Sequence, residues 1–243
     1  MVTLDVSLVP AELAERDLNG WAVAVLDILR ATTVMVTALE NGAAQVVPVL
    51  TPEEALAGAG SRQGALVGGE RKGVALPGFD CGNSPYEYSR EKVAGKTVYL
   101  TTTNGTVALR HAARAGAVTV ACFRNRTAVA RWLAEQEKPV LLACAGRKGR
   151  FSWEDLAGAG AVVAALEAVA PGVFQPTDAA RLARQVFAEW EGRLKELLAS
   201  TEHGRFLIDI GFRDDLPYCA QLDVSRLVPH WEGGSLTAPQ ARA

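Results

Sequence analysis

Short apolar runs of strand length alternate along this chain with stretches of helical pattern. The apolar runs occupy residues 22–26, 46–50, 65–67, 97–100, 118–122 and 139–144. The helical patterns occupy residues 32–40, 51 onward, 105–115, 127–137, 153–170 and 178–199. Strands that alternate with helices form βαβ units, in which helices cover both faces of a parallel sheet. The sequence therefore predicts an α/β protein with a three-layer α/β/α arrangement and a mainly parallel, mixed sheet.

The size of the chain suits one such unit. Of its 243 residues, 49% are hydrophobic and 21% are charged, which is enough to bury a full α/β core. No repeat or low-complexity linker interrupts the pattern, so we expect a single domain over residues 1–243. The end of the chain, around Pro217 and Pro229, is expected to be irregular.

Net charge and the length of the apolar runs indicate which kinds of partner to expect. The formal net charge of -2 and the lack of a dense Lys/Arg run argue against nucleic acid and favour a small molecule. No apolar run reaches the roughly 18 residues of a membrane span. Residues 1–10 lack the pattern of a secretion signal. We therefore expect a cytoplasmic protein without a membrane partner, and leave homo-oligomer formation open.

The cysteines do not suggest a metal site or a disulfide framework. None of the four forms a Cys-x-x-Cys pair, and they stand at positions 81, 122, 144 and 219. We expect free thiols.

Polar segments follow five of the predicted strands, and three of the segments contain glycine. The five segments begin at Asp27, Gly68, Thr101, Phe123 and Ala145. Ligands of open α/β sheets bind outside the carboxyl ends of the strands, where helix N-termini and their loops collect. We therefore expect these segments to converge on one site. The richest of them, residues 68–85, combines glycines, charges of both signs and an Asn-Ser pair.

The first segment has both functional and structural interpretations. Asp27 stands at the end of an apolar strand. A carboxylate there is either a metal-binding or catalytic group or the charge partner of the N-terminus of the following helix, and we favour the metal-binding or catalytic role. Arg30 suits a phosphate oxyanion or an ordinary surface position, and Thr33 suits phosphate binding or a helix cap.

Two later segments lead into helices. The run 101–106 precedes a helical pattern, so its amide groups are well placed to hold an anion. Ser152 and Asp155 have the spacing of a capping box. Capping alone would explain that pair, which leaves Glu154 as the stronger functional candidate.

An alternative mechanism is suggested by Cys144 and Arg150, which have the Cys-x5-Arg spacing of cysteine-dependent phosphatases. A thiolate at a helix N-terminus beside cations would have a lowered pKa and could attack phosphorus. Ala143, where such enzymes usually carry a histidine, weakens this hypothesis.

The motifs together closely resemble the 2-phosphosulfolactate phosphatase family over nearly the whole chain. The resemblance is carried by Asp27-x-x-Arg30-Ala-Thr-Thr, Gly69-Glu-Arg, Pro77-Gly-Phe-Asp-x-Gly-Asn-Ser-Pro85, Thr101-Thr-Thr-Asn-Gly-Thr106, Ala145-Gly, Phe151-Ser-x-Glu-Asp155 and Ser200-x-x-His203-Gly. It implies a Mg²⁺-dependent phosphohydrolase with an α/β/α fold type of its own. The implied reaction releases inorganic phosphate from 2-phospho-3-sulfolactate to give 3-sulfolactate, a step toward coenzyme M.

The resemblance also suggests roles for individual residues. The candidate ligands of Mg²⁺ are the carboxylates Asp27, Glu70, Asp80, Glu154 and Asp155, and Asp27 is equally open to a role as general base or nucleophile. The candidate catalytic residues are Asp27, Arg30, Arg71 and Asn104. Further contacts to phosphate or substrate are expected from Thr33, Asn83, Ser84, Thr103, Gly105 and Gly146. A cation among Arg124, Arg126 and Arg147 is expected to hold the sulfonate.

A non-enzymatic anion-binding module is the hypothesis from a different class. Such a module would use the same basic turns, but it would gain nothing from several acids beside its anion. His203 is expected to be a core histidine, and Trp190 and Trp231 are expected to serve packing.

Overall fold

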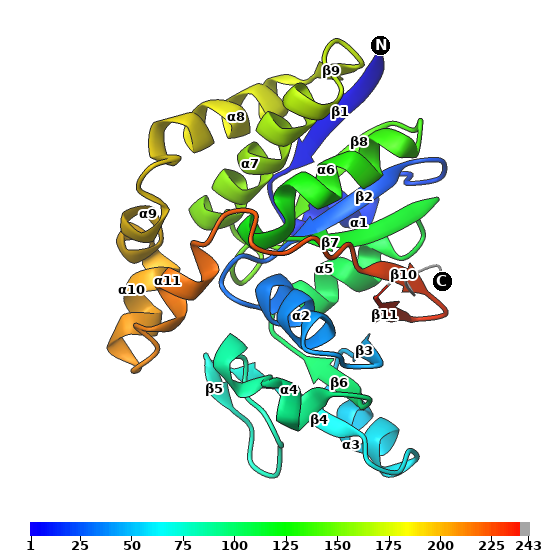
Figure 1. Ribbon diagram of the computed structural model, residues 1–243, viewed down its shortest axis with the longest axis vertical. Helices are drawn as coiled ribbons and strands as arrows, with labels where there is room; N and C mark the ends of the chain where they lie inside the picture. Colours follow the sequence, from blue (N-terminus) through cyan, green and yellow to red (C-terminus); the bar gives the residue numbers. More distant parts are fainter. Residues whose placement is uncertain (239–243) are drawn as a thin grey trace.

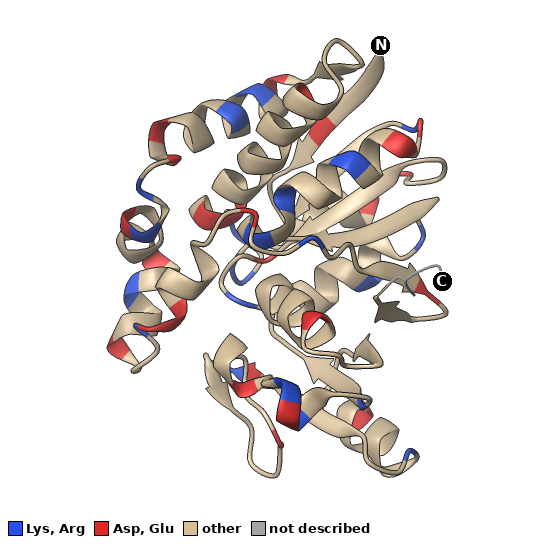
Figure 2. Ribbon diagram, in the orientation of Figure 1, with Lys and Arg blue, Asp and Glu red and all other residues tan. Residues whose placement is uncertain are grey.

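The computed structural model describes residues 1–238 and contains two sheets with helices packed against them (Figure 1). The first sheet has the order β7-β2-β8-β1-β9, and its pairings are parallel. Its strands are β1 (Val2–Ser7), β2 (Ala22–Leu26), β7 (Ala117–Ala121), β8 (Val140–Cys144) and β9 (Phe174–Pro176). Figure 2 shows no charged residue on β2, β7 or β8, as expected for strands buried on both faces.

The second sheet has the order β10-β11-β3-β6-β4-β5. Its centre is parallel and its pairings at both edges are antiparallel. The strands are β3 (Gln45–Pro48), β4 (Leu66–Arg71), β5 (Val74–Ala75), β6 (Thr97–Thr101), β10 (His230–Glu232) and β11 (Ser235–Thr237).

Helices cover both faces of the first sheet. On one face α6 (Arg126–Glu135), α7 (Trp153–Val169) and α8 (Asp178–Trp190) pack side by side, and on the other lie α1 (Pro10–Glu15) and α5 (Gly105–Ala112). Helix α2 (Ala31–Glu40) contacts β7 of the first sheet and β3 of the second, so it lies between the two. This arrangement confirms the predicted α/β/α class.

The remaining helices are short. Helices α3 (Pro52–Gly60) and α4 (Arg90–Val93) belong to the second sheet's connections. Helices α9 (Leu194–Ser200), α10 (Glu202–Asp209) and α11 (Asp215–Cys219) follow one another late in the chain, and the 3₁₀ turns η1 and η2 span Pro85–Glu87 and Phe123–Asn125.

Between its acidic first turn and Glu167, helix α7 is apolar all round, because its neighbours enclose it. Ser152 caps its N-terminus by accepting a hydrogen bond from the amide of Asp155 at 3.4 Å. At Gly160 the helix touches α8 so closely that a Cβ atom would lie 1.9 Å from the carbonyl oxygen of Ala183. The glycine therefore permits the α7–α8 contact.

Replacing Gly160 by Ala should therefore lower the free energy of unfolding by about 1–3 kcal/mol, since one of two backbones must shift. The matched control is Gly192→Ala, because nothing lies within 4 Å of the Cβ it would add. Urea unfolding of both variants checks the expectation, and equal stability of the two would show that the contact relaxes without cost.

The structure differs from the sequence prediction in several places, and strands β1, β5 and β9 and helix α1 were not predicted. The helix expected over 178–199 is divided into α8 and α9, with Gly192 in the break. Strand β4 continues to Arg71, so Glu70 and Arg71 lie in a strand and not in a loop after it. The late segment expected to be irregular contains α10, α11, β10 and β11. These elements are short, and Thr201, which accepts a hydrogen bond from the amide of Gly204, caps α10.

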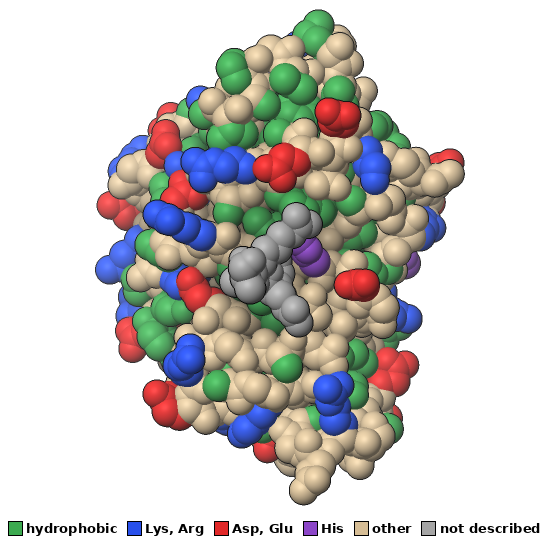
Figure 3. Space-filling model, turned by 45° about the vertical axis from the view of Figure 1, so that its right-hand side comes forward, with side chains coloured by type: hydrophobic (Ala, Val, Ile, Leu, Met, Phe, Trp, Pro, Cys, Tyr) green, Lys and Arg blue, Asp and Glu red, His purple; other side chains and the backbone are tan. Residues whose placement is uncertain are grey.

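The four cysteines are free, as predicted, and all four are buried. No helix within residues 1–238 is long and apolar enough to cross a bilayer. On the face shown in Figure 3, acidic and basic side chains are interspersed and do not form a basic stripe. Trp190 and Trp231 are half-buried and pack against the core, as expected.

Candidate active site

A cavity of about 380 Å³ lies where the carboxyl ends of strands from both sheets face helix α10. Strands β2 and β8 of the first sheet lead into it, and so do β4 and β6 of the second. Its lining includes Asp27, Arg30, Glu70, Arg71, Lys72, Asn83, Thr103, Asn104, Arg147, Lys148, His203 and Phe206. Four of the five predicted polar segments therefore converge, and they do so at a junction of two sheets.

Asp27 is the central carboxylate of this cavity. It follows β2 and precedes α2, and its Oδ1 accepts a hydrogen bond from the amide of Ala31 at 3.1 Å. No described residue donates a hydrogen bond to its other oxygen. Burial raises the pKa of Asp27 to about 6, although a positive charge on His203 opposes the shift. A carboxylate with this pKa is poised to exchange a proton near neutral pH.

The N-terminus of helix α5 packs closely against Asp27. A Cβ atom on Gly105 would lie 2.7 Å from Asp27 Oδ2 and 2.5 Å from the Cβ of Ala31. Only glycine lets this helix N-terminus approach the carboxylate. Asn104, the residue before it, accepts a hydrogen bond from the amide of Lys148 at 2.9 Å and thereby joins the β6 and β8 loops.

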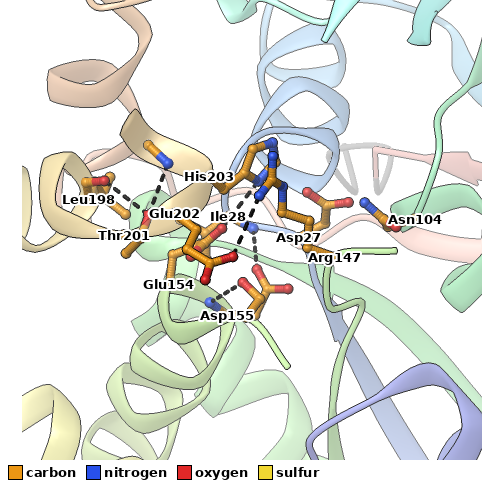
Figure 4. A network of polar contacts seen from close by, with 12 residues as sticks. Asp27, Ile28, Asn104, Arg147, Glu154, Asp155, Leu198, Thr201, Glu202 and His203 are labelled. Carbon is orange, nitrogen blue, oxygen red and sulfur yellow. Dashed lines mark hydrogen bonds and ion pairs between the residues drawn. The ribbon is translucent and has the colours of Figure 1, made fainter. Parts of the chain in front are cut away.

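His203 and Glu154 form a hydrogen-bonded pair beside Asp27 (Figure 4). The distance between His203 Nδ1 and Glu154 Oε1 is 3.1 Å. Burial raises the pKa of Glu154, but the hydrogen bond and the charge of His203 outweigh it and hold the pKa below its ordinary value. The side chain of His203 is 17% exposed and lines the cavity, so the expectation of a core histidine is wrong.

Asp155 has a structural position below the site. Its two oxygens accept hydrogen bonds from the amides of Ile28 and Gly146, each at 2.9 Å, and so fasten the β2 and β8 loops together. Burial, followed by the charges of Asp27 and Glu154, raises its pKa well above the ordinary value. Asp155 does not line the cavity, and both of its oxygens are occupied by these two amides.

Glu70 and Arg71 line the cavity from the second sheet. Glu70 accepts hydrogen bonds from the amide and hydroxyl of Thr103 at 2.9 and 2.8 Å, and from the amide of Gly73 at 2.7 Å. Arg71 donates to Thr101 Oγ1 at 3.0 Å. Oε1 of Glu70 thus holds the β6 loop against β4, and Oε2 holds the turn between β4 and β5.

Arg30 is buried and already paired. It donates to Asp215 Oδ2 at 2.6 Å and to the carbonyl of Gly73 at 2.8 Å, and it lies over the ring of Phe212 at 4.2 Å. Asp215 also accepts from Ser84 Oγ at 2.7 Å. Arg30 and Ser84 therefore anchor helix α11, and the charge of Arg30 is largely compensated by Asp215.

Several other predicted contacts lie elsewhere. Asp80 is exposed and accepts a hydrogen bond from the amide of Val67 at 2.8 Å, outside the cavity. Thr33 is buried in α2 and donates to the carbonyl of Ile28, so it does not face the cavity either. Gly146 supports a turn, with φ at +65° and the Arg150 carbonyl 2.3 Å from where its Cβ would be. These positions correct the predicted substrate and metal contacts.

Two of the three expected sulfonate cations also point away. Arg124 contacts Glu40 and Gln221, and Arg126 pairs with Asp223 at 2.9 Å. Neither lines the cavity, so Arg147 is the one that remains.

Asn83 does lie in the cavity wall, and it has an unsatisfied atom. The residue is 5% exposed, and its Oδ1 has no hydrogen-bond partner within the described chain. A buried amide oxygen without a partner is costly, unless a bound group completes it. Asn83 is thus positioned to contact a ligand.

The cations of the cavity come in two matching turns, and the sequence interpretation noted their arginines but not Lys72 and Lys148 or the shared Arg-Lys-Gly triplet. Arg71-Lys72-Gly73 connects β4 and β5, and Arg147-Lys148-Gly149 forms a second tight turn in which Arg147 and Arg150 exchange backbone hydrogen bonds. In both, the lysine and the glycine have positive φ, at 53° and 78° and at 52° and 75°. This is the geometry of a two-residue hairpin turn. The repeated triplet was the signal that could have revealed them.

Cys144 is buried at the end of β8. Burial, followed by the charges of Asp155, Glu12 and Glu154, raises the pKa of its thiol well above the ordinary value. A nucleophilic cysteine needs the opposite environment. The cysteine-dependent alternative therefore has no support in the structure.

Accordingly, Cys144→Ser should keep the hydrolytic activity that the family resemblance implies, within about threefold, because the thiol stays protonated and does not face the cavity. Steady-state hydrolysis by the folded variant checks this expectation. A trapped phosphocysteine, or a loss of several orders of magnitude, would restore the cysteine mechanism.

Comparisons with known proteins give one consistent result. A family model described as 2-phosphosulpholactate phosphatase matches residues 7–234. A probable 2-phosphosulfolactate phosphatase of Symbiobacterium thermophilum is 43% identical, over 95% of this chain and 98% of the relative. Relatives with the same name in Caldanaerobacter subterraneus and Deinococcus radiodurans are 38% and 44% identical, over 93% and 84% of this chain and 94% and 85% of their own lengths.

Proposed function

This chain belongs to the 2-phosphosulfolactate phosphatase family, and on that premise we propose that it hydrolyses 2-phospho-3-sulfolactate to 3-sulfolactate and inorganic phosphate. The observation that carries the proposal is the cavity itself. It holds a protonatable carboxylate, Asp27, between two hairpins that each present an arginine and a lysine. A substrate with phosphate, carboxylate and sulfonate groups suits that distribution of charge.

We propose that Asp27 acts beside the reacting phosphorus atom, as the general base. In its ionised form it accepts a proton from the attacking water, and the N-terminus of α5 beside it stabilises charge on the phosphoryl oxygens. His203, oriented by Glu154, donates a proton to the leaving alkoxide. The phosphorus–oxygen ester bond breaks as the bond to water's oxygen forms.

The cations of the two hairpins hold the substrate. Arg71 and Lys72 approach from the second sheet and Arg147 and Lys148 from the first. Guanidinium groups bind carboxylate, sulfonate and phosphate through paired hydrogen bonds. Fixing the substrate at both ends positions its phosphoryl group over Asp27.

We also propose Mg²⁺ as the cofactor. Within residues 1–238, no group of three or more His, Cys, Asp or Glu side chains is arranged to hold a metal ion. Mg²⁺ needs no such group, because it is usually bound by one or two carboxylates together with water and substrate phosphate. Asp27, with its unpartnered oxygen, and Glu154 would hold the ion, which would supply neutralisation of charge on the phosphoryl group.

Excess chelator should therefore reduce phosphate release by at least about 100-fold, and added Mg²⁺ should restore it. Phosphate release from 2-phosphosulfolactate, measured with and without chelator, tests both parts of the proposal. Turnover that persists in chelator would refute the metal requirement alone. The absence of turnover with Mg²⁺ present would refute the substrate.

The non-enzymatic alternative gains no specific support. A module that only binds an anion would not place a buried carboxylate with a free oxygen between its cations, because that charge repels the ligand.

Three wider proposals follow from the family premise and the sequence. The four free thiols fit a reducing compartment, so we propose a cytoplasmic location. A role in coenzyme M biosynthesis and the absence of nucleic acid among the partners stay predictions.

A further inference from the structure

A second cavity of about 760 Å³ adjoins the first and has no function so far. The two share Arg147, Lys148 and His203 in their linings, so the second hairpin forms the boundary between them. The first cavity, at about 380 Å³, is by itself large enough for a three-carbon phospho acid. The larger space is therefore not explained by 2-phosphosulfolactate.

The lining of the second cavity has a distinct chemistry. Beyond the shared residues it contains Arg150 and Arg205, and it contains Phe151 and Trp153, which are 46% and 49% exposed. Large aromatic side chains exposed in the wall of a cavity offer flat apolar surface to a ligand. Arginines beside them offer charge to an anionic group.

The lining of the second cavity has four basic side chains, Arg147, Lys148, Arg150 and Arg205, against two acidic ones, Glu154 and Glu202. Glu154 is paired with His203, and Glu202 approaches Arg147 at 3.8 Å from an exposed position. Arg205 donates to the carbonyl of Ser200, a neutral group that leaves its positive charge uncompensated. The second cavity therefore favours a ligand group that is both planar and negatively charged.

We propose that the second cavity is a subsite for the tail of larger substrates, namely phosphorylated 2-hydroxy acids whose third carbon carries an aromatic group with an anionic substituent. The phosphoryl group of such a substrate lies over Asp27, and its tail passes the Arg147–Lys148 hairpin to reach Trp153 and Arg205. The reaction is unchanged: water's oxygen bonds to phosphorus, the ester bond breaks, and the alkoxide takes a proton. The inference rests on the proposed function.

The test compares two synthetic substrates, 2-phospho-3-sulfolactate and 2-phospho-3-(4-sulfophenyl)lactate, which differ by one phenylene ring. We expect the parent enzyme to hydrolyse the long substrate with a kcat/KM within about tenfold of the short one. Trp153→Ala and Arg205→Gln should each reduce kcat/KM for the long substrate at least about tenfold, mainly through KM, while the short substrate changes less than about twofold. Arg181→Gln, an exposed arginine on α8, is the matched control and should alter neither.

Two results would overturn the proposal. One is a parent enzyme that hydrolyses the short substrate but not the long one. The other is a pair of variants in which both substrates fall together, or in which neither falls. If neither substrate is hydrolysed by the parent enzyme with Mg²⁺ present, the proposed function has failed instead. Binding of 3-(4-sulfophenyl)lactate, measured by isothermal titration calorimetry, then decides the subsite separately: saturable binding that is lost in Arg205→Gln supports it, and binding that is absent or unchanged in Arg205→Gln refutes it.

Discussion

Asp27→Asn should reduce kcat by about 10³–10⁴-fold and leave the fold intact. The variant keeps an oxygen that accepts the hydrogen bond from the Ala31 amide, but it loses the group that exchanges a proton at the reacting phosphorus. Single-turnover hydrolysis of 2-phosphosulfolactate measures the chemical step directly. Near-normal activity would show that Asp27 serves only its helix.

The same variant separates function from stability. In the metal-free protein, the folded pKa of about 6 lies above the ordinary value of 3.8. A raised carboxyl pKa means that Asp27 stabilises the fold fully below pH 3.8, and that this contribution is lost as pH rises through 6. At pH 8 the Asp27→Asn variant should therefore be more stable than the parent, by on the order of 2–3 kcal/mol, because its amide carries no buried charge.

Urea unfolding at pH 3.5 and pH 8, with chelator present, checks the sign. A variant that is less stable than the parent at pH 8 would contradict it. The ionised Asp27 carboxylate would then not destabilise the folded state.

Arg30→Leu should lower the free energy of unfolding by about 3–5 kcal/mol, the second large effect that we expect. The substitution leaves Asp215, whose side chain is 3% exposed, without its ionic partner in the interior. The carbonyl of Gly73 loses a donor as well. Chemical unfolding of the metal-free variant measures the loss.

Two further variants test whether the loss of stability comes from the unpaired buried charge of Asp215. Adding Asp215→Leu to Arg30→Leu should recover part of the lost stability, because the unpaired charge is removed. Arg193→Leu, which breaks the exposed pair with Glu189, should change stability by less than about 1 kcal/mol. Equal effects of the buried and exposed substitutions would refute the importance of burial.

The sequence was most informative where the physics is local. The apolar run 22–26 became β2 with those bounds, because a strand buried on both faces leaves little choice of residue. Asp27, Glu70, Asn104 and Arg147 were recognised because polar groups at strand ends are conspicuous in such a pattern.

What the sequence did not reveal depends on pairings over long separations. Glu154 and His203 are 49 residues apart, and nothing local to His203 distinguishes a catalytic from a packed histidine. The partner of Arg30 is 185 residues away, so its guanidinium was assigned to phosphate when it is held by Asp215. The division into two sheets was equally hidden, since strand order is set by tertiary packing.

The two Arg-Lys hairpins stand on different sheets, one on β4–β5 and the other after β8. A ligand that binds both hairpins is consequently a non-covalent cross-link between two separately hydrogen-bonded sheets. Its binding free energy adds to the free energy of unfolding whenever binding requires both sheets to be folded. The substrate thus becomes, while it is bound, a structural component of the protein.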